Sequence, residues 1–132
     1  MRFVLTALVY LSGLLCLFLA AGFLIDPANS AAGLGIRADT PAALSTIRAD
    51  FTAFFGLTGL AMLWGAWRRN GDLLIAPALV YATAFTGRTI DLIVNGAYPM
   101  WWQPMAVEAF WAVLLFAAWR VLPHHKLEEI AA

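Results

Sequence analysis

The stretch FVLTALVYLSGLLCLFLAAGFLI, residues 3–25, contains no charged residue. A helix of about 20 apolar residues is long enough to cross a hydrocarbon core about 30 Å thick. The stretch also exceeds the roughly 7–15 apolar residues that form the core of a signal peptide. We therefore predict a retained transmembrane helix at the start of the chain.

Three further apolar stretches of comparable length follow, at residues 42–67, 73–94 and 104–122. Each is long enough to form a membrane-spanning helix. Together the four stretches leave no room for a separate soluble module. The sequence thus predicts a single all-α domain over residues 1–132, folded as an integral membrane, antiparallel four-helix bundle.

The connections carry their own signals. Pro27 ends the first helix because it lacks a backbone N–H, and a loop through Gly35 is expected to follow. Thr40 then serves as an N-cap with Pro41 at the first helical position. The short polar turn RRNGD, which starts at Arg68, makes the second and third helices antiparallel neighbours.

The composition agrees with a membrane protein. Hydrophobic residues make up 63% of the chain and charged residues 12%, whereas a soluble domain has about 25% charged residues. This composition excludes soluble enzymes and disordered tails, and a net charge of +0 excludes nucleic-acid binding through a basic surface. The single cysteine, Cys16, excludes a disulfide framework, and with Ser12 and Ala20 it forms a small-residue stripe expected at a helix contact.

The basic residues predict the orientation, because positively charged loops are retained on the cytoplasmic side. Arg37 alone lies in a loop on one side, whereas the other side carries Arg2, Arg68, Arg69, Arg120 and Lys126. We therefore expect both the N- and C-termini to be cytoplasmic. Asn70 and His125 are expected on that side, with Ala31 and Ala97 facing outward.

Five ionisable residues lie inside the predicted spans: Arg48, Asp50, Arg88, Asp91 and Glu108. Charges at membrane depth are costly unless they are paired or reached by water. Three separate helices place these charges in the outer half of the bundle, roughly 6–10 Å from a helix end at 1.5 Å per residue. This common depth makes them the candidate ligand-binding residues.

Helical spacing indicates which of these side chains meet. Arg88 and Asp91 share one face of the third helix with Asn95, and that face continues through Ala84 and Tyr81. An unpaired arginine at this depth is costly. We therefore expect Arg88 to be neutralised by Asp91 or by Glu108 of the fourth helix.

The second helix carries the other two charges. Arg48 shares a face with Gly56 and Gly59, small residues expected to leave space for a headgroup or a neighbouring helix. Asp50 points about 200° away from Arg48 at roughly 100° per residue. We therefore predict a core cluster of Arg48, Arg88, Asp91 and Glu108, with Asp50 outside it.

Structural explanations for the same residues stay open. Arg48 has a long stem that can reach the outer headgroups. The charged cluster as a whole can serve only to fix the register of the bundle. The adjacent His124 and His125 do not share a helical face, so no metal site is predicted there.

The chain resembles a known family at these residues: IRADF at residues 47–51, Gly87-Arg88 followed by Asp91, and Glu108 in the last helix. It is similar to a bacterial four-helix membrane family catalogued as a domain of unknown function, and more distantly to DoxX-like membrane proteins, some of which are linked to redox or thiol metabolism. The resemblance implies a multi-pass protein of the bacterial inner membrane with a polar site at Arg48, Arg88 and Glu108.

Three functions remain open. The favoured one is binding of a lipid headgroup or a small polar or anionic ligand, because arginine makes bidentate contacts with carboxylates and phosphates. The alternative is an accessory or assembly subunit that packs on a membrane-protein partner or on its own copies. An enzyme using Glu108 as acid or base is the third, but no nucleophile, metal set or cofactor motif accompanies it. We therefore expect no catalytic residues and no cofactor, with the lipid bilayer as surroundings.

Overall fold

The computed structural model describes residues 1–124 and is all-helical over that range, without a strand. Four helices are long and apolar enough to cross a membrane, which confirms the predicted fold class. Their ends differ from the expected ranges by only one or two residues. The long helices are α1 (Arg2–Ile25), α3 (Pro41–Arg68), α4 (Ile75–Asn95) and α5 (Trp102–Val121).

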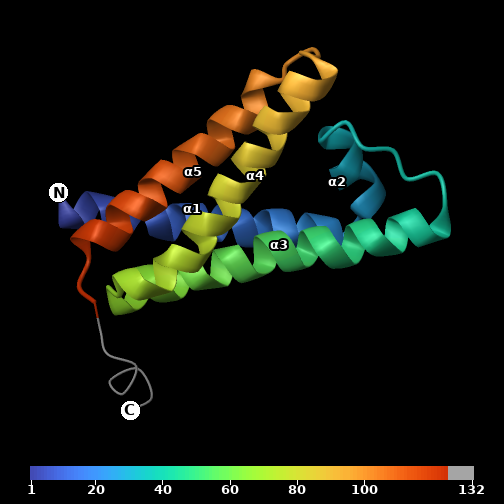
Figure 1. Cartoon of the computed structure of the whole chain (residues 1–132). Helices are drawn as coiled ribbons and strands as arrows, with labels where there is room; N and C mark the ends of the chain where they lie inside the picture. Colours follow the sequence, from blue (N-terminus) through green and yellow to red (C-terminus); the bar gives the residue numbers. More distant parts are fainter. Residues whose placement is uncertain (125–132) are drawn as a thin grey trace.

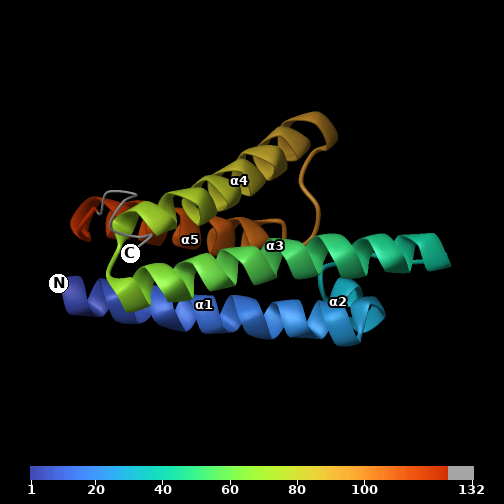
Figure 2. The same cartoon turned by 90° about the horizontal axis from the view of Figure 1, so that it is seen from below.

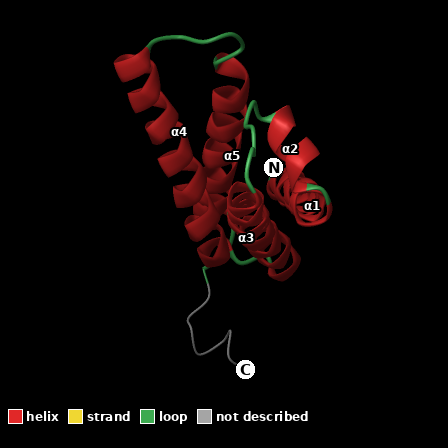
Figure 3. Cartoon of the chain, turned by 90° about the vertical axis from the view of Figure 1, so that its right-hand side faces the viewer, coloured by secondary structure: helices red, strands yellow, loops and turns green. Residues whose placement is uncertain are grey.

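The four long helices form two pairs. Helix α1 packs along α3, and α4 packs along α5 (Figures 1 and 2). The pairs meet near the N-terminus of the chain and diverge toward the end that carries α2 (Figure 1). Seen from that end, α4 lies farthest from α1, with α3 and α5 between them (Figure 3). The bundle is therefore wedge-shaped, and its two ends are called here the α2 end and the η1 end.

Small residues bring α1 and α3 together. A Cβ atom added to Gly13 would lie 3.0 Å from the carbonyl oxygen of Gly59, and one added to Gly59 would lie 3.1 Å from the Cβ of Cys16. The stripe of Ser12, Cys16 and Ala20 is buried, as expected for a helix contact. The glycine face of α3 thus receives α1. The expectation that a neighbouring helix approaches at Gly59 is confirmed, and the alternative that Gly59 leaves space for a headgroup is wrong.

The segment expected as a loop after the first helix contains a second helix, α2 (Pro27–Gly33). Pro27 both ends α1 and occupies the first turn of α2, where a missing N–H costs nothing. The carboxylate of Asp26 accepts a hydrogen bond from the Asn29 backbone N–H at 3.2 Å, which caps α2. The Thr40 hydroxyl caps α3 in the predicted way, accepting from the Ala43 N–H at 3.1 Å.

At the other end, the turn between α3 and α4 is the 3₁₀ helix η1 (Gly71–Leu74). The Gly71 N–H donates to the Pro123 carbonyl at 2.8 Å, and His124 Nδ1 lies 2.6 Å from Asp72 Oδ1. These contacts join the end of α5 to the turn and hold the two helix pairs together there. Two residues expected on the cytoplasmic side, His125 and Lys126, lie outside the described residues.

The core lies where the two pairs meet. Its largest fully buried side chains include Met62 of α3, Tyr81 of α4 and Leu115 of α5. The Tyr81 ring packs against Trp111, with 4.8 Å between the ring centroids. This aromatic contact marks the boundary between the packed core and the open end of the wedge.

Candidate functional site

A cavity of about 680 Å³ fills the space between the diverging helix pairs at the α2 end. Residues of α1, α3, α4 and α5 line it, together with residues 33–35 at the end of α2 and residues 98–100 between α4 and α5. Its volume is within the range of about 300–1,000 Å³ typical of small-molecule sites. Most of its wall is apolar, with six aromatic side chains: Phe51, Phe54, Phe55, Tyr81, Tyr98 and Trp111.

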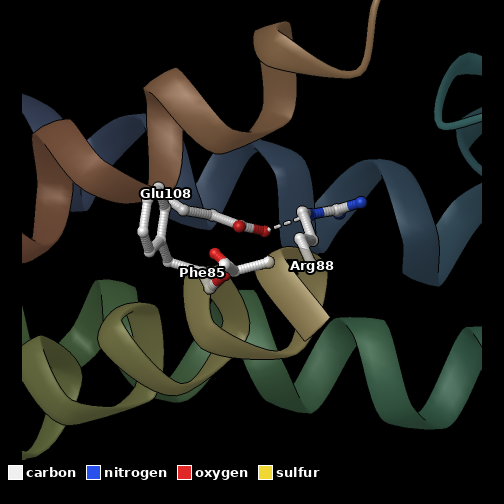
Figure 4. A network of polar contacts seen from close by, with 4 residues as sticks. Phe85, Arg88 and Glu108 are labelled. Carbon is white, nitrogen blue, oxygen red and sulfur yellow. Dashed lines mark hydrogen bonds and ion pairs between the residues drawn. The ribbon is translucent and has the colours of Figure 1, made fainter. Parts of the chain in front are cut away.

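An ion pair between Arg88 and Glu108 lies in the wall of this cavity (Figure 4). Arg88 Nε donates to Glu108 Oε1 at 2.7 Å. The two residues face each other across the α4–α5 hairpin, Arg88 seven residues before the end of α4 and Glu108 early in α5. The prediction that Arg88 is neutralised by Asp91 or Glu108 is confirmed, with Glu108 as the partner.

The two partners differ in exposure. The Arg88 side chain is 38% exposed, whereas the Glu108 side chain is 12% exposed. The second carboxylate oxygen of Glu108, Oε2, is buried and has no hydrogen-bond partner among the described residues. The terminal nitrogens of Arg88 point away from Glu108 (Figure 4), and Tyr98 interacts with the same guanidinium.

The face predicted for α4 is the one that lines the cavity. Tyr81, Ala84 and Arg88 all contribute to the wall, as their spacing indicates. Asp91 continues this stripe along α4 but lies beyond the cavity, exposed, with its carboxylate accepting from Asn95 Nδ2 at 2.6 Å. The structure therefore does not bring Asp91 into the cluster with Arg88.

The two charged residues of α3 occupy the opposite positions, relative to the cavity, from those predicted. Asp50 lines the cavity, whereas Arg48 is exposed and takes no part in its wall. The physical reason is the packing of α1 on the glycine face of α3, which leaves the face with Asp50 and Phe54, four residues apart, toward α4 and α5. The prediction that Arg48 lies inside the cluster and Asp50 outside it is wrong.

A buried polar group beneath the cavity was not predicted as such. The Tyr81 hydroxyl lies 3.2 Å from Cys16 Sγ and 3.1 Å from Thr58 Oγ1. The packing role expected for Cys16 agrees with its complete burial. The sequence signal for this polar group was Tyr81, which occupies a core position on the face of α4 that lines the cavity. A buried tyrosine hydroxyl needs a hydrogen-bond partner.

The groups in the cavity wall are suited to binding a small molecule. Its wall combines one guanidinium, two carboxylates and aromatic rings, and the carboxylates of Asp50 and Glu108 come from different helix pairs. Within residues 1–124, no group of three or more His, Cys, Asp or Glu side chains is arranged to hold a metal ion. The arrangement suits a molecule with an apolar body and a small polar group.

Comparison with known proteins identifies a family. Residues 4–119 match the model of a protein family described as "Domain of unknown function (DUF4345)". No curated protein and no solved structure matches the chain.

Proposed function

The chain belongs to the DUF4345 family, and from its geometry we propose that it is a membrane protein that binds a lipid or another small amphipathic molecule in the cavity at the α2 end. The observation that carries this proposal is the cavity itself: about 680 Å³ of space with an aromatic wall and a single charged pair, Arg88 and Glu108. Specific binding sites combine an apolar lining with a few placed polar groups in this way.

The position of the cavity supports a ligand that arrives from the bilayer. The cavity lies between spans that are themselves apolar on their outer faces, with exposed side chains such as Leu57, Leu60 and Ile93. We therefore expect an amphipathic ligand to enter the wedge from the surrounding lipid. Its polar group would lie at the level of Arg88 and Glu108, and its tail along the aromatic side chains.

We further propose that the protein is a multi-pass protein of the bacterial inner membrane, with both termini in the cytoplasm. The exposed Arg68 and Arg69 flank η1, which supports a cytoplasmic η1 end under the positive-inside rule. The α2 end and its cavity then belong to the outer half of the membrane.

The proposal can be tested by filling the cavity with a larger side chain at a residue that lines it. Ala84 lies in the wall, whereas Thr83, its neighbour in α4, is exposed and outside it. The wild type and the Ala84→Phe and Thr83→Phe variants are purified in a mild uncharged detergent, and co-purifying small molecules are measured by native mass spectrometry. A bound molecule should be present in the wild type and in Thr83→Phe, and reduced at least tenfold in Ala84→Phe.

Other outcomes contradict the proposal. A molecule retained by Ala84→Phe at the wild-type level binds elsewhere on the protein. A wild type without a small molecule that instead co-purifies stoichiometrically with another membrane protein supports an accessory subunit. Turnover of a bound molecule that is lost in Glu108→Gln supports an enzyme with Glu108 as acid or base.

A further inference from the structure

We infer that the polar group of the ligand is a hydrogen-bond donor carrying positive charge, an amine, and not the anionic group that two arginines would select. This inference rests on the proposed function, since it names the chemical class of the molecule bound in the same cavity. Three features of the wall carry it: its net charge, its unsatisfied acceptors and its aromatic rings.

The first feature is the charge of the wall. Three charged residues line the cavity, Asp50, Arg88 and Glu108. Arg48, the second cation that would favour an anion, is exposed outside it. Because Arg88 is already paired with Glu108 at 2.7 Å, the wall presents a net negative charge from Asp50. An anion entering the cavity is therefore repelled, whereas a cation neutralises the wall.

The second feature is a surplus of acceptors. An ionised carboxylate has about four lone-pair sites, and Glu108 uses Oε1 for Arg88 while Oε2 stays buried and unpartnered. No hydrogen bond to the Asp50 carboxylate occurs among residues 1–124. Leaving a buried acceptor without a donor costs free energy. An ammonium group has three donors and no acceptor, so it satisfies these oxygens without adding an acceptor of its own.

The third feature is the aromatic lining beside the carboxylates. Phe51 stacks on Phe23 with ring centroids 4.8 Å apart, and Phe54 meets Tyr81 edge to face at 5.6 Å. These contacts hold the rings in fixed positions around the cavity. The faces of aromatic rings attract cations such as ammonium groups. The apolar remainder of the wall accommodates a hydrocarbon chain.

The experiment compares three probes with one hydrocarbon chain and different polar groups: dodecylamine, dodecanol and dodecanoate, each with the same diazirine in the chain. They are titrated into the purified full chain in an uncharged detergent at neutral pH and crosslinked by light. Labelling of the α3 and α5 peptides that contain Phe51, Phe54 and Trp111 is quantified by mass spectrometry, which gives an apparent Kd for the cavity.

Dodecylamine should bind at least about tenfold more tightly than dodecanoate, a difference of about 1.4 kcal/mol. The advantage should fall at least threefold in Asp50→Asn and in Glu108→Gln. Asp50 is exposed, so Asp50→Asn tests the inference even where Glu108→Gln fails to fold. Asp91→Asn removes a carboxylate of α4 outside the cavity and should leave the advantage unchanged.

The experiment distinguishes failure of the amine assignment from failure of the proposed function. Dodecanoate labelling the same peptides as tightly as dodecylamine overturns the amine assignment and leaves the proposed function intact. An amine advantage that Asp91→Asn abolishes, with Asp50→Asn unaffected, shows binding at the exposed end of α4 and overturns the assignment as well. Absence of labelling of the cavity peptides by all three probes contradicts the proposed function itself.

Discussion

The ion pair between Arg88 and Glu108 should respond asymmetrically to the loss of either partner. Breaking a fully buried pair by removing one partner costs about 3–5 kcal/mol in soluble proteins. Without Glu108, the long and 38% exposed side chain of Arg88 can extend toward the headgroup region, so Glu108→Gln should cost about 1 kcal/mol. Without Arg88, the 12% exposed Glu108 is left uncompensated, and Arg88→Gln should cost about 2–4 kcal/mol.

Thermal unfolding of purified variants in one mild detergent, followed by circular dichroism, measures this difference. For a chain of this length each kcal/mol corresponds to about 4 °C in Tm, so Arg88→Gln should melt clearly below Glu108→Gln. The double variant should be less destabilised than the sum of the single ones, with a coupling free energy of about 0.5–2 kcal/mol.

The control cycle pairs Arg88 with Asp91, which shares its helical face but hydrogen-bonds to Asn95. Arg88→Gln and Asp91→Asn should be additive within about 0.5 kcal/mol. Additivity in the Glu108 cycle, coupling in the Asp91 cycle, or a larger loss from Glu108→Gln than from Arg88→Gln would each refute the reasoning.

Three further predictions concern packing and orientation. Gly59→Ala places a Cβ within 3.0 Å of a carbonyl oxygen of α1 and should cost about 1–3 kcal/mol in thermal unfolding, whereas Gly87→Ala, which meets nothing within 4 Å, should be neutral or slightly stabilising; equal losses would contradict the α1–α3 contact. Tyr81→Phe leaves two buried polar groups without their shared partner and should lower stability by about 1–3 kcal/mol, so an unchanged Tm would show that this hydrogen-bonded group contributes nothing. In a cysteine-free background of intact cells, Ala97→Cys should react with an impermeant thiol reagent and Pro123→Cys should not, and the reverse pattern would invert the topology.

The orientation test uses different positions from those that the sequence alone selects. Asn70 is 2% exposed and Ala31 is 0% exposed, so a cysteine at either position would be shielded whichever side it faced. Ala97 and Pro123 are exposed at opposite ends of the bundle. Loop position predicts the side of the membrane, whereas burial decides whether a reagent reaches the site.

Much of the fold could be predicted from the sequence because apolar length and helix caps are local properties. Pro27 and Thr40 affect only the backbone next to them in the chain, so the end of α1 and the start of α3 could be predicted from single residues. Helix α2 was missed because its seven residues are too few for a periodic pattern. The signals for α2 were Asp26 as an N-cap and Pro27 in the first turn, and Pro27 was interpreted only as the end of α1.

The candidate site was predictable only in part, because spacing gives the angle between two side chains but not the direction that either one faces. The 200° between Arg48 and Asp50 was sound geometry. Which of the two side chains points into the cavity depends on where α1 packs on α3. Helix α1 packs on α3 at Gly13 and Gly59. Arg88 and Glu108 were easier to place, since a short hairpin connects their helices and brings the two residues to the same level.

Small and large residues are distributed differently at the two ends of the bundle. At the η1 end, a Cβ on Gly65 would lie 2.5 Å from Leu74, and one on Gly71 would lie 2.7 Å from the Trp119 carbonyl oxygen. These glycines allow the two helix pairs to touch. Toward the α2 end, α3 carries Phe51, Phe54 and Phe55. The rings of Phe51 and Phe55 stack on each other and on Phe23 of α1, and Phe54 meets Phe55 edge to face.

The helix pairs diverge from the η1 end toward α2 (Figure 1), and along this stretch Phe51, Phe54 and Phe55 of α3 line the cavity between them. The space between the pairs opens at the depth where the chain places Asp50, Arg88 and Glu108. An apolar bundle gains nothing in stability from an open wedge or from charges in its wall. Both features together are expected of a site that a ligand completes, because a bound molecule would fill the space and satisfy the buried carboxylate oxygen.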